Sequence, residues 1–470
     1  MRSSTPCRRA TRLVEHGDAA AALLAARGQF ATTISFHIVL AAFSIGLAQG
    51  LMLLEALWLW RKREIYMDVY RFWLKVFALT VAVGTASGLV MEYQFGLNWS
   101  RLSAQAGAII GPLMFYEVLV AFFLEAGFLG IMLFGLKKVG PRLHFLATCA
   151  VAAGSLVSAF WILSANSWMH TPAGYSIGTD GRFIAQDWWA IVFNPSFPYR
   201  LAHMLIAALM GSATLVAGTG AWQLLREPGN PRARLQYSMA LWAIAVLAPL
   251  QIVAGDLHGQ HTLKVQPIKI AAIEGSWHRP APGTGEPLRL FALPDMAERL
   301  NHFEVAIPRL GSLYLTHDLS GTIEALDEFP PGDLPPVPIV FFAFRIMVGL
   351  GLLMAAQGVA SLVLRWRGRL EQARWLQQAS VILAPAGFLA MLSGWVVTEV
   401  GRQPFTIHGL LRTADSVSSV SAPSVVWATL AILAFYTLVF GGGLWVLLRL
   451  LRHPPRPGEP GPQPGLGEGP

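Results

Sequence analysis

Long apolar runs dominate this chain, and short polar segments rich in Lys and Arg separate them. A helix needs about twenty apolar residues to cross the hydrocarbon layer of a membrane. Measured against that length, the pattern predicts nine membrane-spanning helices, approximately at residues 30–60, 73–96, 109–136, 143–166, 199–224, 235–256, 338–364, 376–399 and 424–450. The first run is long for one crossing, so we expect it to tilt or to extend beyond the bilayer at its Trp58 and Trp60 end.

The basic residues predict how these helices are oriented. Lys and Arg gather after the first, third, fifth, seventh and ninth runs, for example at Arg61, Lys138, Arg226 and Arg365. Short cytoplasmic loops are enriched in these residues, so we predict the N-terminus outside and the C-terminus in the cytoplasm. The arginines of the extreme N-terminus disagree with this rule, because they lie on the predicted outer side.

The polar segments divide the chain into five parts. These are an N-terminal tail (1–27), helices one to six (28–255), an outer loop (256–338), helices seven to nine (339–452) and a C-terminal tail (453–470). The outer loop is rich in Pro and in mixed charge, so we expect an ordered loop without a core of its own. The C-terminal tail is rich in Pro and Gly, and we expect it to be disordered.

The composition supports a membrane protein and excludes other classes. The chain is 54% hydrophobic and only 13% charged, whereas soluble proteins have about 25% charged residues. Two cysteines exclude a disulfide framework and a Cys-based metal centre. The net charge of +8 lies at the ends of the spans and not on one patch, so no nucleic-acid partner is predicted. The expected fold is an all-α polytopic membrane protein.

Ionisable residues inside the predicted spans are the candidate functional residues. A charge at the centre of a bilayer costs about 3 kcal/mol even on lenient scales. The candidates are Glu55, Lys75, Glu92, Glu117, Glu125, His37, His203, Arg345 and Glu399, and most lie in the predicted outer half. Imidazole and thioether are axial donors of haem iron, which makes His37, His203 and Met347 candidate haem ligands. The alternative for each lone His is a hydrogen bond to a backbone carbonyl or a Ser.

The buried carboxylates have two interpretations. Glu117 and Glu125 are eight residues apart, so on a helix their directions differ by about 80° and they lie about 12 Å apart. That arrangement suits a proton relay, and the alternative is that each pairs with a nearby Lys or Arg. Glu55 and Lys75 lie toward the cytoplasmic ends, where we expect them to be paired or to extend to the membrane surface.

Several local strings resemble subunit I of the cytochrome bd family of quinol oxidases. The segment GWVVTEVGRQPF at 394–405 is similar to the family signature GWxxxExGRQPW. Further similar strings are MEYQFGLNWS at 91–100, FFLE at 122–125, KIAAIE at 269–274 and FAFRIM at 342–347. The resemblance covers about residues 28–450 in order. Phe405 departs from the signature, which has Trp there, and the short outer loop resembles the cyanide-insensitive branch.

The resemblance implies the haem ligands. His203 and Met347 match the axial ligands of a low-spin haem b, and Glu399 matches the ligand of a second, high-spin haem b. His37 matches the ligand of a third haem, either d or b, where oxygen is reduced.

The resemblance also implies the residues around these haems. Arg345, Trp395 and Arg402 are the expected haem contacts, Glu92, Glu117 and Glu125 the expected acidic residues of the haem-pair site and the proton route, and Lys269 and Glu274 the expected quinol-binding residues. Because Arg345 and Met347 are two residues apart, they point to nearly opposite sides of their helix. We therefore expect the arginine to meet a propionate or a carboxylate away from the iron.

The resemblance implies a quinol:oxygen oxidoreductase in the bacterial inner membrane. Such an enzyme oxidises ubiquinol or menaquinol at the outer face and reduces oxygen to water with cytoplasmic protons, which builds a membrane potential without pumping. The implied partners are a second polytopic subunit in a heterodimer, a small single-helix subunit and membrane lipid.

Two other functions stay open from the residues alone. A proton-coupled secondary transporter would need repeated halves and broken helices, yet Pro112 and Pro385 do not occupy corresponding positions. A membrane b-type cytochrome that only relays electrons would need two low-spin sites, and the sequence offers one His and Met pair.

Overall fold

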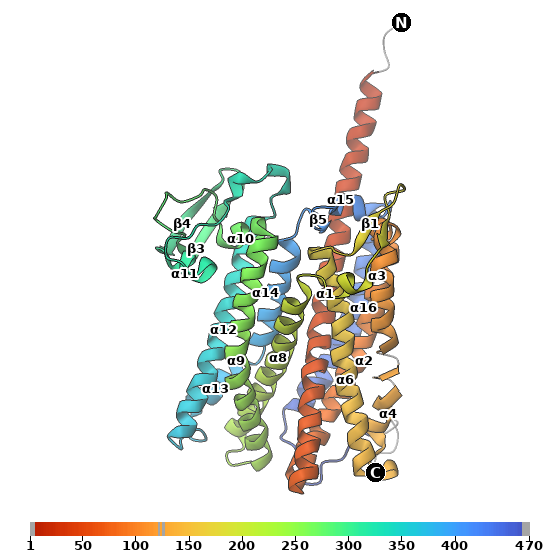
Figure 1. Cartoon of the computed structure of the whole chain (residues 1–470). Coiled ribbons are helices and arrows are strands. Elements are labelled where there is room, and N and C mark those ends of the chain that lie inside the picture. The colour runs from red at the N-terminus through yellow and green to blue at the C-terminus, as the bar shows by residue number, and fades with distance from the viewer. Residues whose placement is uncertain (1–4, 121–122, 125–126, 463–470) are drawn as a thin grey trace.

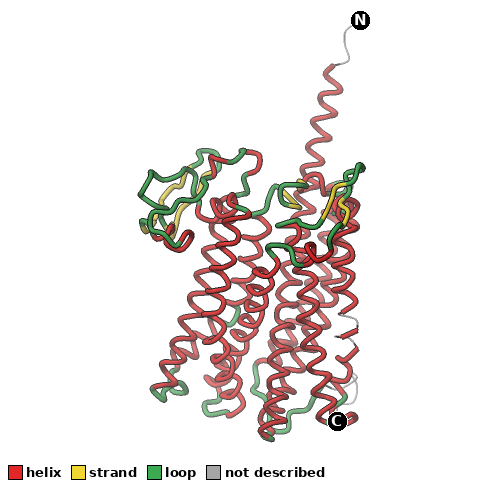
Figure 2. Tube along the Cα trace, viewed as in Figure 1, coloured by secondary structure: helices red, strands yellow, loops and turns green. Residues whose placement is uncertain are grey.

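The computed structural model describes residues 5–120, 123–124 and 127–462, with side chains from residue 20 onward. The chain forms a bundle of long helices, and short strands and loops gather at one end of it (Figures 1 and 2). Nine helical segments of the described residues are long and apolar enough to cross a membrane. The predicted all-α class and the predicted number of spans are therefore confirmed.

The spans consist of α1 (Thr5–Arg61), α2 (Glu64–Leu97), α3 (Ser100–Val120), α6 (Pro141–His170), α7 with α8 (Trp188–Val192 and Phe197–Arg226), α9 (Pro231–Val265), α12 (Val337–Trp366), α13 with α14 (Arg374–Ile382 and Ala386–Val400) and α16 (Ala422–Leu451). Shorter helices are α4 (Gly127–Phe134), α5 (Leu136–Val139), α10 (Pro267–Glu274), α11 (Leu310–Thr316), α15 (Thr413–Ser416) and the 3₁₀ turns η2 (Leu326–Glu328) and η3 (Pro331–Asp333).

Three predicted boundaries were wrong. Helix α3 begins at Ser100, nine residues before the predicted start, because its first two turns carry polar residues that a hydropathy reading skips. Helix α9 continues to Val265, so the outer loop begins about ten residues later than predicted. Helix α1 already begins at Thr5 and projects beyond the bundle at its N-terminal end (Figure 1). Its Ala-rich start favours helix, so residues 5–27 continue the first span instead of forming a separate tail.

The helices pack into one bundle through pairs distant in sequence. Helix α8 packs on α9, α12 packs on α14 and α9, and α6 lies against α1, α3 and α8. The largest fully buried side chains include Trp73 and Tyr70 on α2 and Trp168 on α6. The eighth span is interrupted at Leu383–Pro385, between α13 and α14, whereas Pro112 lies inside a continuous α3.

The three two-stranded hairpins of the described residues lie at the end of the bundle where the loops gather, which we call the loop end (Figure 2). They pair β1 with β2 (Tyr175–Ile177 and Phe183–Ala185), β3 with β4 (Leu288–Asp295 and Leu300–Ile307) and β5 with β6 (Phe405–Ile407 and Leu411–Arg412). Trp277, Leu315 and Ile323 of the outer loop pack on α10, α12 and α14. The loop thus shares its apolar core with the helix ends, as expected for an ordered loop that has none of its own.

The opposite end of the bundle carries the basic junctions, and we call it the basic end. Contacts there join helix ends that are far apart in sequence. Arg232 of α9 forms an ion pair with Asp68 of α2 at 2.7 Å, and Gln223 of α8 donates to the carbonyl of His453 at 3.0 Å. The prediction that these junctions share one side of the membrane agrees with this arrangement.

The C-terminal segment differs from its expected disorder. Residues 453–462 lie against α2, where the backbone N–H of Gly458 donates to Asp68 at 2.9 Å and Glu459 pairs with Lys75. The prolines and glycines of this segment disfavour a helix. The backbone N–H of Gly458 therefore has no partner within a helix and bonds the buried carboxylate of Asp68 instead. Lys75 is therefore paired, as its position near the helix end suggested.

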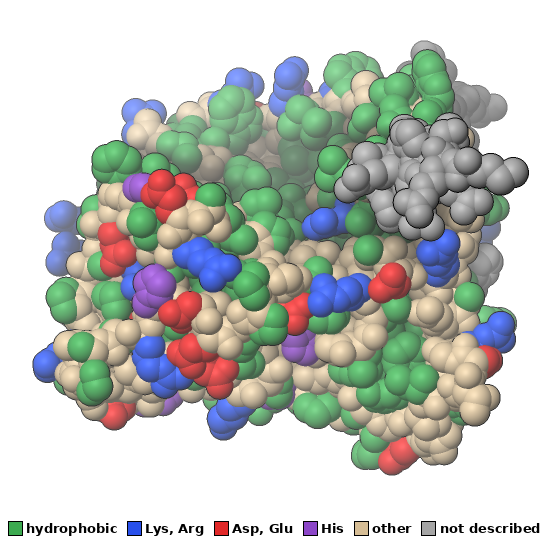
Figure 3. Space-filling model, turned by 90° about the horizontal axis from the view of Figure 1, so that it is seen from above, with side chains coloured by type: hydrophobic (Ala, Val, Ile, Leu, Met, Phe, Trp, Pro, Cys, Tyr) green, Lys and Arg blue, Asp and Glu red, His purple; other side chains and the backbone are tan. Residues whose placement is uncertain are grey.

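The surface separates into a charged end and apolar sides. Seen onto the loop end, the molecule shows basic, acidic and His side chains interspersed with apolar ones (Figure 3). Along the sides, α16 exposes Trp427, Leu438 and Trp445, and only 6% of its most apolar stretch is buried. Such a surface is stable only against lipid or another apolar protein surface.

Candidate functional site

A cluster of buried polar residues surrounds Glu399 at the loop end of α14. Oε1 of Glu399 accepts a hydrogen bond from Asn166 of α6 at 2.9 Å and lies 3.5 Å from Nε2 of His170. Arg402, three residues further on, pairs with the other carboxylate oxygen. The pair forms because α14 ends at Val400, so the chain turns at Gly401 and Arg402 folds back over Glu399.

Two more cations complete the cluster and leave it positively charged. Nζ of Lys269, on α10, lies 3.3 Å from Nδ1 of His170, and Arg200 is 7% exposed at the start of α8. Burial lowers the pKa of Lys269 well below its ordinary value, and the charges of Arg200 and Arg402 lower it further. Burial also lowers the pKa of the Arg402 guanidinium, although Glu399 opposes this effect. One carboxylate thus faces three cationic side chains.

Some donors in this cluster have no protein partner among the described residues. They are Nε of Arg200 and both Nε and Nη1 of Arg402. A buried guanidinium N–H without an acceptor is costly, and anionic oxygens are the partners that guanidinium groups favour. The cluster therefore fits a bound group that carries carboxylates, as haem does through its propionates.

His203 lies one turn beyond Arg200 on α8. Its Nε2 is 3.0 Å from the side-chain amide of Gln251, while its buried Nδ1 has no hydrogen-bond partner among the described residues. Its ring lies 5.5 Å from the ring of His258, and a Cβ on Gly255 of α9 would come within 3.4 Å of it. A half-buried imidazole with a free ring nitrogen is able to coordinate haem iron, and the role of His203 as a ligand stays a prediction.

Met347 of α12 points toward α14. Its sulfur lies 3.0 Å from where a Cβ on Gly394 would be, so a larger residue there would displace the thioether. Trp395, the next residue, packs with Met204 and Ala207 of α8 around a small cluster that includes Ala208. Helices α8 and α12, which carry His203 and Met347, both pack on α9 and α14. The two predicted ligands thus belong to helices with shared neighbours.

Arg345 points away from Met347, as predicted from their spacing. It donates to the carbonyls of Arg289 at 2.8 Å and Ile273 at 2.7 Å, and lies 3.8 Å from the Glu274 carboxylate. It also covers the ring of Phe341 at 3.3 Å. Of the two partners expected for Arg345, a propionate or a carboxylate, the structure shows a carboxylate, that of Glu274 on α10.

Glu274 forms a second buried site beneath the outer loop. The carboxylate is 1% exposed, accepts a hydrogen bond from the hydroxyl of Tyr314, and has no hydrogen-bond partner for its Oε2 among the described residues. Burial raises its pKa, although Arg345, the Tyr314 hydrogen bond and Arg289 oppose this effect. A carboxyl group with a raised pKa and a free oxygen can exchange a proton with a bound molecule.

The structure separates the two predicted quinol-binding residues. Lys269 and Glu274 are five apart on α10, so their directions differ by about 140°. Lys269 joins the Glu399 cluster, and Glu274 joins Tyr314 and the outer loop. Sequence reasoning grouped them because they share one short string.

The remaining predicted residues lie on α1, α2 and α3. Nδ1 of His37 is 3.0 Å from the hydroxyl of Ser87, and a Cβ on Gly88 would approach the ring to 3.2 Å. Glu117 accepts a hydrogen bond from Ser158 of α6 at 2.8 Å. Glu92 is exposed and lines a cavity of about 370 Å³ between α2 and α3. Glu125 lies outside the described residues.

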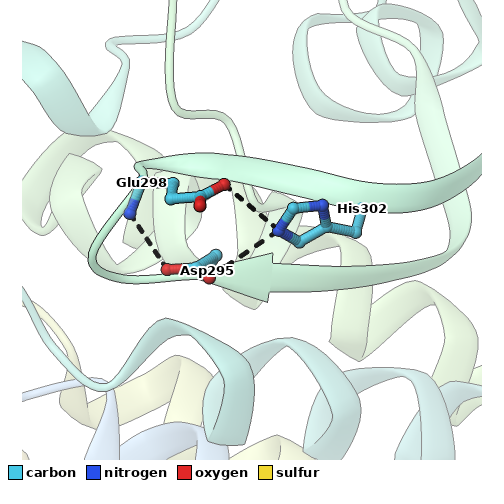
Figure 4. Close-up of side chains that lie close together, drawn as sticks. All are labelled: Asp295, Glu298 and His302. Atoms are coloured by element: carbon cyan, nitrogen blue, oxygen red, sulfur yellow. Dashed lines mark hydrogen bonds and ion pairs between the residues drawn. The ribbon is translucent and has the colours of Figure 1, made fainter.

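A separate group of ionisable side chains lies at the tip of the β3–β4 hairpin (Figure 4). Nε2 of His302 is 3.7 Å from Asp295 and 3.5 Å from Glu298, and all three side chains are exposed by a third or more. Backbone hydrogen bonds from Glu298 and Ala297 lower the pKa of Asp295. These ion pairs and turn contacts account for the arrangement without a ligand.

Several residues of these clusters escaped the sequence reading. They are Asn166, His170, Arg200, His258 and the α6 residues that contact buried carboxylates. Arg200 lies three residues before His203, so this spacing on one helix could have predicted that the two side chains lie near each other. His258 fell beyond the predicted end of its span, and nothing in hydropathy marks the buried face of α6.

The fold and these clusters define a class of protein. The molecule is a helical membrane protein with buried imidazole, thioether, carboxylate and guanidinium groups that fit haem. They lie at the end of the bundle where an ordered loop covers a buried carboxyl group with a raised pKa. Membrane electron-transfer enzymes have this combination.

Comparisons with known proteins identify the family. The family model for cytochrome bd terminal oxidase subunit I matches residues 25–455. The chain is 35% identical to the cytochrome bd ubiquinol oxidase subunit 1 of Bacillus subtilis, over 91% of this chain and 92% of that one. It is 31% identical to the cytochrome bd-II ubiquinol oxidase subunit 1 of Escherichia coli, over 91% of this chain and 96% of that one.

A solved structure agrees with these relatives. The bd oxidase of Geobacillus thermodenitrificans matches with a TM-score of 0.85 at 26% identity, covering 92% of this chain and 98% of that chain. The chain therefore belongs to the cytochrome bd terminal oxidase subunit I family, which confirms the family and the enzyme class predicted from its sequence strings.

Proposed function

We propose that this chain is the haem-carrying subunit of a quinol:oxygen oxidoreductase in the bacterial cytoplasmic membrane. Family membership supports the reaction class. The observation that carries the assignment to this chain is the buried cluster in which Glu399 faces Arg200, Arg402 and Lys269, with guanidinium donors left for an anionic group. Haem iron supplies the one-electron steps and the oxygen chemistry.

The proposed ligand set follows the residues described above. His203 and Met347 hold the low-spin haem b, Glu399 holds the second haem b, and His37 holds the third haem, of type d or b. Arg200 and Arg402 bond the carboxylates that haem carries. We assign Lys269 to the same task, because it lies beside His170 and not beside Glu274.

Quinol oxidation is assigned to the pocket beneath the outer loop. Glu274 accepts a proton from the quinol hydroxyl, and its raised pKa favours holding that proton before release. Tyr314 and Arg345 fix the position of the carboxylate by a hydrogen bond and an ion pair. Ubiquinol and menaquinol both fit this chemistry.

The direction of proton movement follows from the two ends of the bundle. We assign the basic end to the cytoplasm by the distribution of Lys and Arg. Protons released beneath the outer loop then leave outside, and protons for water enter from the cytoplasm past Glu117, with Glu92 and Glu125 as further acidic residues of the route. A membrane potential results without a pump.

A second polytopic subunit is the proposed partner in a heterodimer. The exposed aromatic and aliphatic surface of α16 supports contact with an apolar partner or lipid. A small single-helix subunit fits the same kind of surface.

The first experiment is spectroscopic. A reduced-minus-oxidised visible spectrum of the purified complex, with the extracted haems identified by mass, should show three haems and distinguish d from b. Met347→Leu should remove the low-spin signal, because leucine offers no donor to iron, while Met354→Leu, a buried core change on the same helix, should retain it. A folded complex without haem would contradict the proposal and favour a proton-coupled transporter.

A further inference from the structure

The β3–β4 hairpin of the outer loop exposes apolar side chains along one face. In β4, Val305 is 57% exposed and Ile307 is 42% exposed, and alternate residues of a strand share a face. The register places Phe291 opposite Val305 and Leu288 opposite Ile307. Residues opposite each other in an antiparallel pair lie on the same face, so both strands contribute to it.

Phe303 is the most exposed apolar residue of the hairpin. Its side chain is 78% exposed, and its φ of +51° lies in the left-handed region, which bulky residues rarely adopt. Exposure of an aromatic ring to water and this backbone conformation both cost free energy, and apolar surroundings would offset the cost. We call Phe291, Phe303, Val305 and Ile307 the apolar surface of the hairpin.

This apolar surface continues onto an exposed side of α12. The rings of Phe291 and Phe342 have their centroids 6.0 Å apart. Ile339, Phe342 and Ile346 are spaced by three and four residues, so they share one side of α12, and both isoleucines are more than half exposed. Because α12 is one of the spans, this side faces the apolar part of the membrane. The apolar surface of the hairpin therefore extends a surface that already lies in the membrane.

The hairpin lies beside α12 near the edge of the hydrocarbon layer. Helix α12 has 30 residues and is about 45 Å long, so about 7.5 Å extends on each side of a layer that is about 30 Å thick. Phe342, five residues after Val337, lies about 7.5 Å from the start of the helix. Arg345, which donates to the carbonyl of Arg289 in β3, lies about 12 Å from that start. The hairpin projects sideways from the helices at this level (Figure 1).

The polar groups of the hairpin fit the boundary between headgroups and acyl chains. Arg299 directly precedes β4 and Arg309 follows it by two residues, and both are exposed and form no ion pair with a described residue. Guanidinium groups bond phosphate oxygens, which every phospholipid headgroup offers. Glu304 instead pairs with Arg289 at 3.2 Å. The strand edges leave backbone groups unpaired, which excludes the hydrocarbon interior but not the hydrated interface.

We propose that the β3–β4 hairpin is an interfacial membrane anchor, whose apolar surface lies among phospholipid acyl chains and whose two flanking arginines bond phosphate groups of the same leaflet. The partner is the phospholipid surface next to α12. Arg289 of β3 also donates to the carbonyl of Glu274 at 3.3 Å, so the anchored strand borders the Glu274 pocket. Quinol that arrives through lipid meets the pocket at this border. That last step rests on the proposed function, whereas the contact with lipid does not.

Photochemical cross-linking tests which molecule covers Phe303. The complete complex in phospholipid vesicles carries Phe303→p-benzoylphenylalanine, and the adduct formed on illumination is identified by mass. The control is His302→p-benzoylphenylalanine, at the preceding residue, whose ring faces Asp295 and Glu298 at the hairpin tip (Figure 4). Both native side chains are at least 44% exposed, so neither replacement removes a buried core residue.

Position 303 should form phospholipid adducts at least five times as abundant as those of position 302. A smaller ratio, or a cross-link from position 303 to a protein chain in place of lipid, would overturn the proposal. Quinol oxidation by the unmodified complex is measured beside it. Phospholipid adducts in a complex that oxidises no quinol would contradict the proposed function and support the anchor, so the two failures are distinguishable.

A second measurement applies if the variants do not assemble. Phospholipid with a photoreactive diazirine on its acyl chain is added to the unmodified complex, and the labelled peptides are identified by mass. Ile339 and Ile346 of α12 are the reference for contact with lipid, and the exposed residues 281–284 of the outer loop are the negative control. Residues 303–307 should carry at least a third of the label found on α12. Label on α12 without label on residues 303–307 would overturn the proposal.

Discussion

The buried charges at the two ends of the bundle are compensated in different ways. At the loop end, Glu399 is surrounded by Arg200, Arg402 and Lys269, and several guanidinium donors have no protein partner among the described residues. At the basic end, Glu55 is hydrogen-bonded to His144, and Asp68 pairs with Arg232. The loop end carries excess positive charge, whereas Glu55 and Asp68 at the basic end each have a side-chain partner from another helix.

This difference indicates which end is completed by something other than the chain. A buried charge without a partner costs several kcal/mol, so folding tolerates it only where a ligand compensates for it. The pairs at the basic end are completed by side chains of the protein and need no ligand. Changes at the two ends should therefore have different consequences, and three variants test this comparison.

The largest effect is expected for Glu399→Gln at the loop end. It removes the only carboxylate that the structure places against Arg402 and His170, so buried cations are left without an anion. We expect loss of haem and a destabilisation of about 3–5 kcal/mol. Haem per protein and the thermal unfolding temperature measure both. The control is Glu371→Gln, an exposed ion pair with Arg234 that should cost about 1 kcal/mol or less. Normal haem content in Glu399→Gln would contradict the view that the charges at the loop end depend on a bound ligand.

The next effect is expected for Glu274→Gln beneath the outer loop. Burial raises the pKa of this carboxyl group, so the unprotonated base is lost as the pH falls through that raised pKa, and quinol oxidation should fall with it. Glutamine accepts no proton, so we expect at least a tenfold lower rate and no such acidic limb. Steady-state quinol oxidation across a pH series measures this, with haem content as the control. An acidic limb unchanged in the variant would show that another group titrates there.

The smallest effect is expected for Asp68→Asn at the basic end. The variant weakens the pair with Arg232 and the hydrogen bond from Gly458, which should cost about 1–3 kcal/mol. We expect a lower unfolding temperature and faster proteolysis of residues 453–462, with haem content unchanged. A loss of haem as large as that in Glu399→Gln would show that the two ends do not differ as described.

Part of the site was predictable because its signals are local. The string GWVVTEVGRQPF predicted Glu399 and Arg402, and the structure brings the two together. The spacing of Arg345 and Met347 predicted opposite directions, which the contacts with Glu274 and Gly394 bear out. The roles of these residues as haem ligands and contacts stay predictions.

Other parts depended on the rotation of helices about their axes. Glu55 and His144 are 89 positions apart, and Asn166 and Glu399 are 233 apart. Hydropathy determines that each segment crosses the membrane but not which face it turns to its neighbour. Lys269 and Glu274 were grouped for the same reason, although α10 turns them to different sites.

By itself, the sequence determined the helical class, the number of spans, the basic end and the family, because apolar length, Lys and Arg distribution and short motifs are properties of consecutive residues. Only the tertiary structure decided that one face of α6 meets Glu55, Glu117 and Glu399, that Lys269 joins His170, and that residues 453–462 bond α2. Those contacts arise when distant helices pack side by side, and the free energy that selects them comes from burying and pairing groups that are not neighbours in the chain.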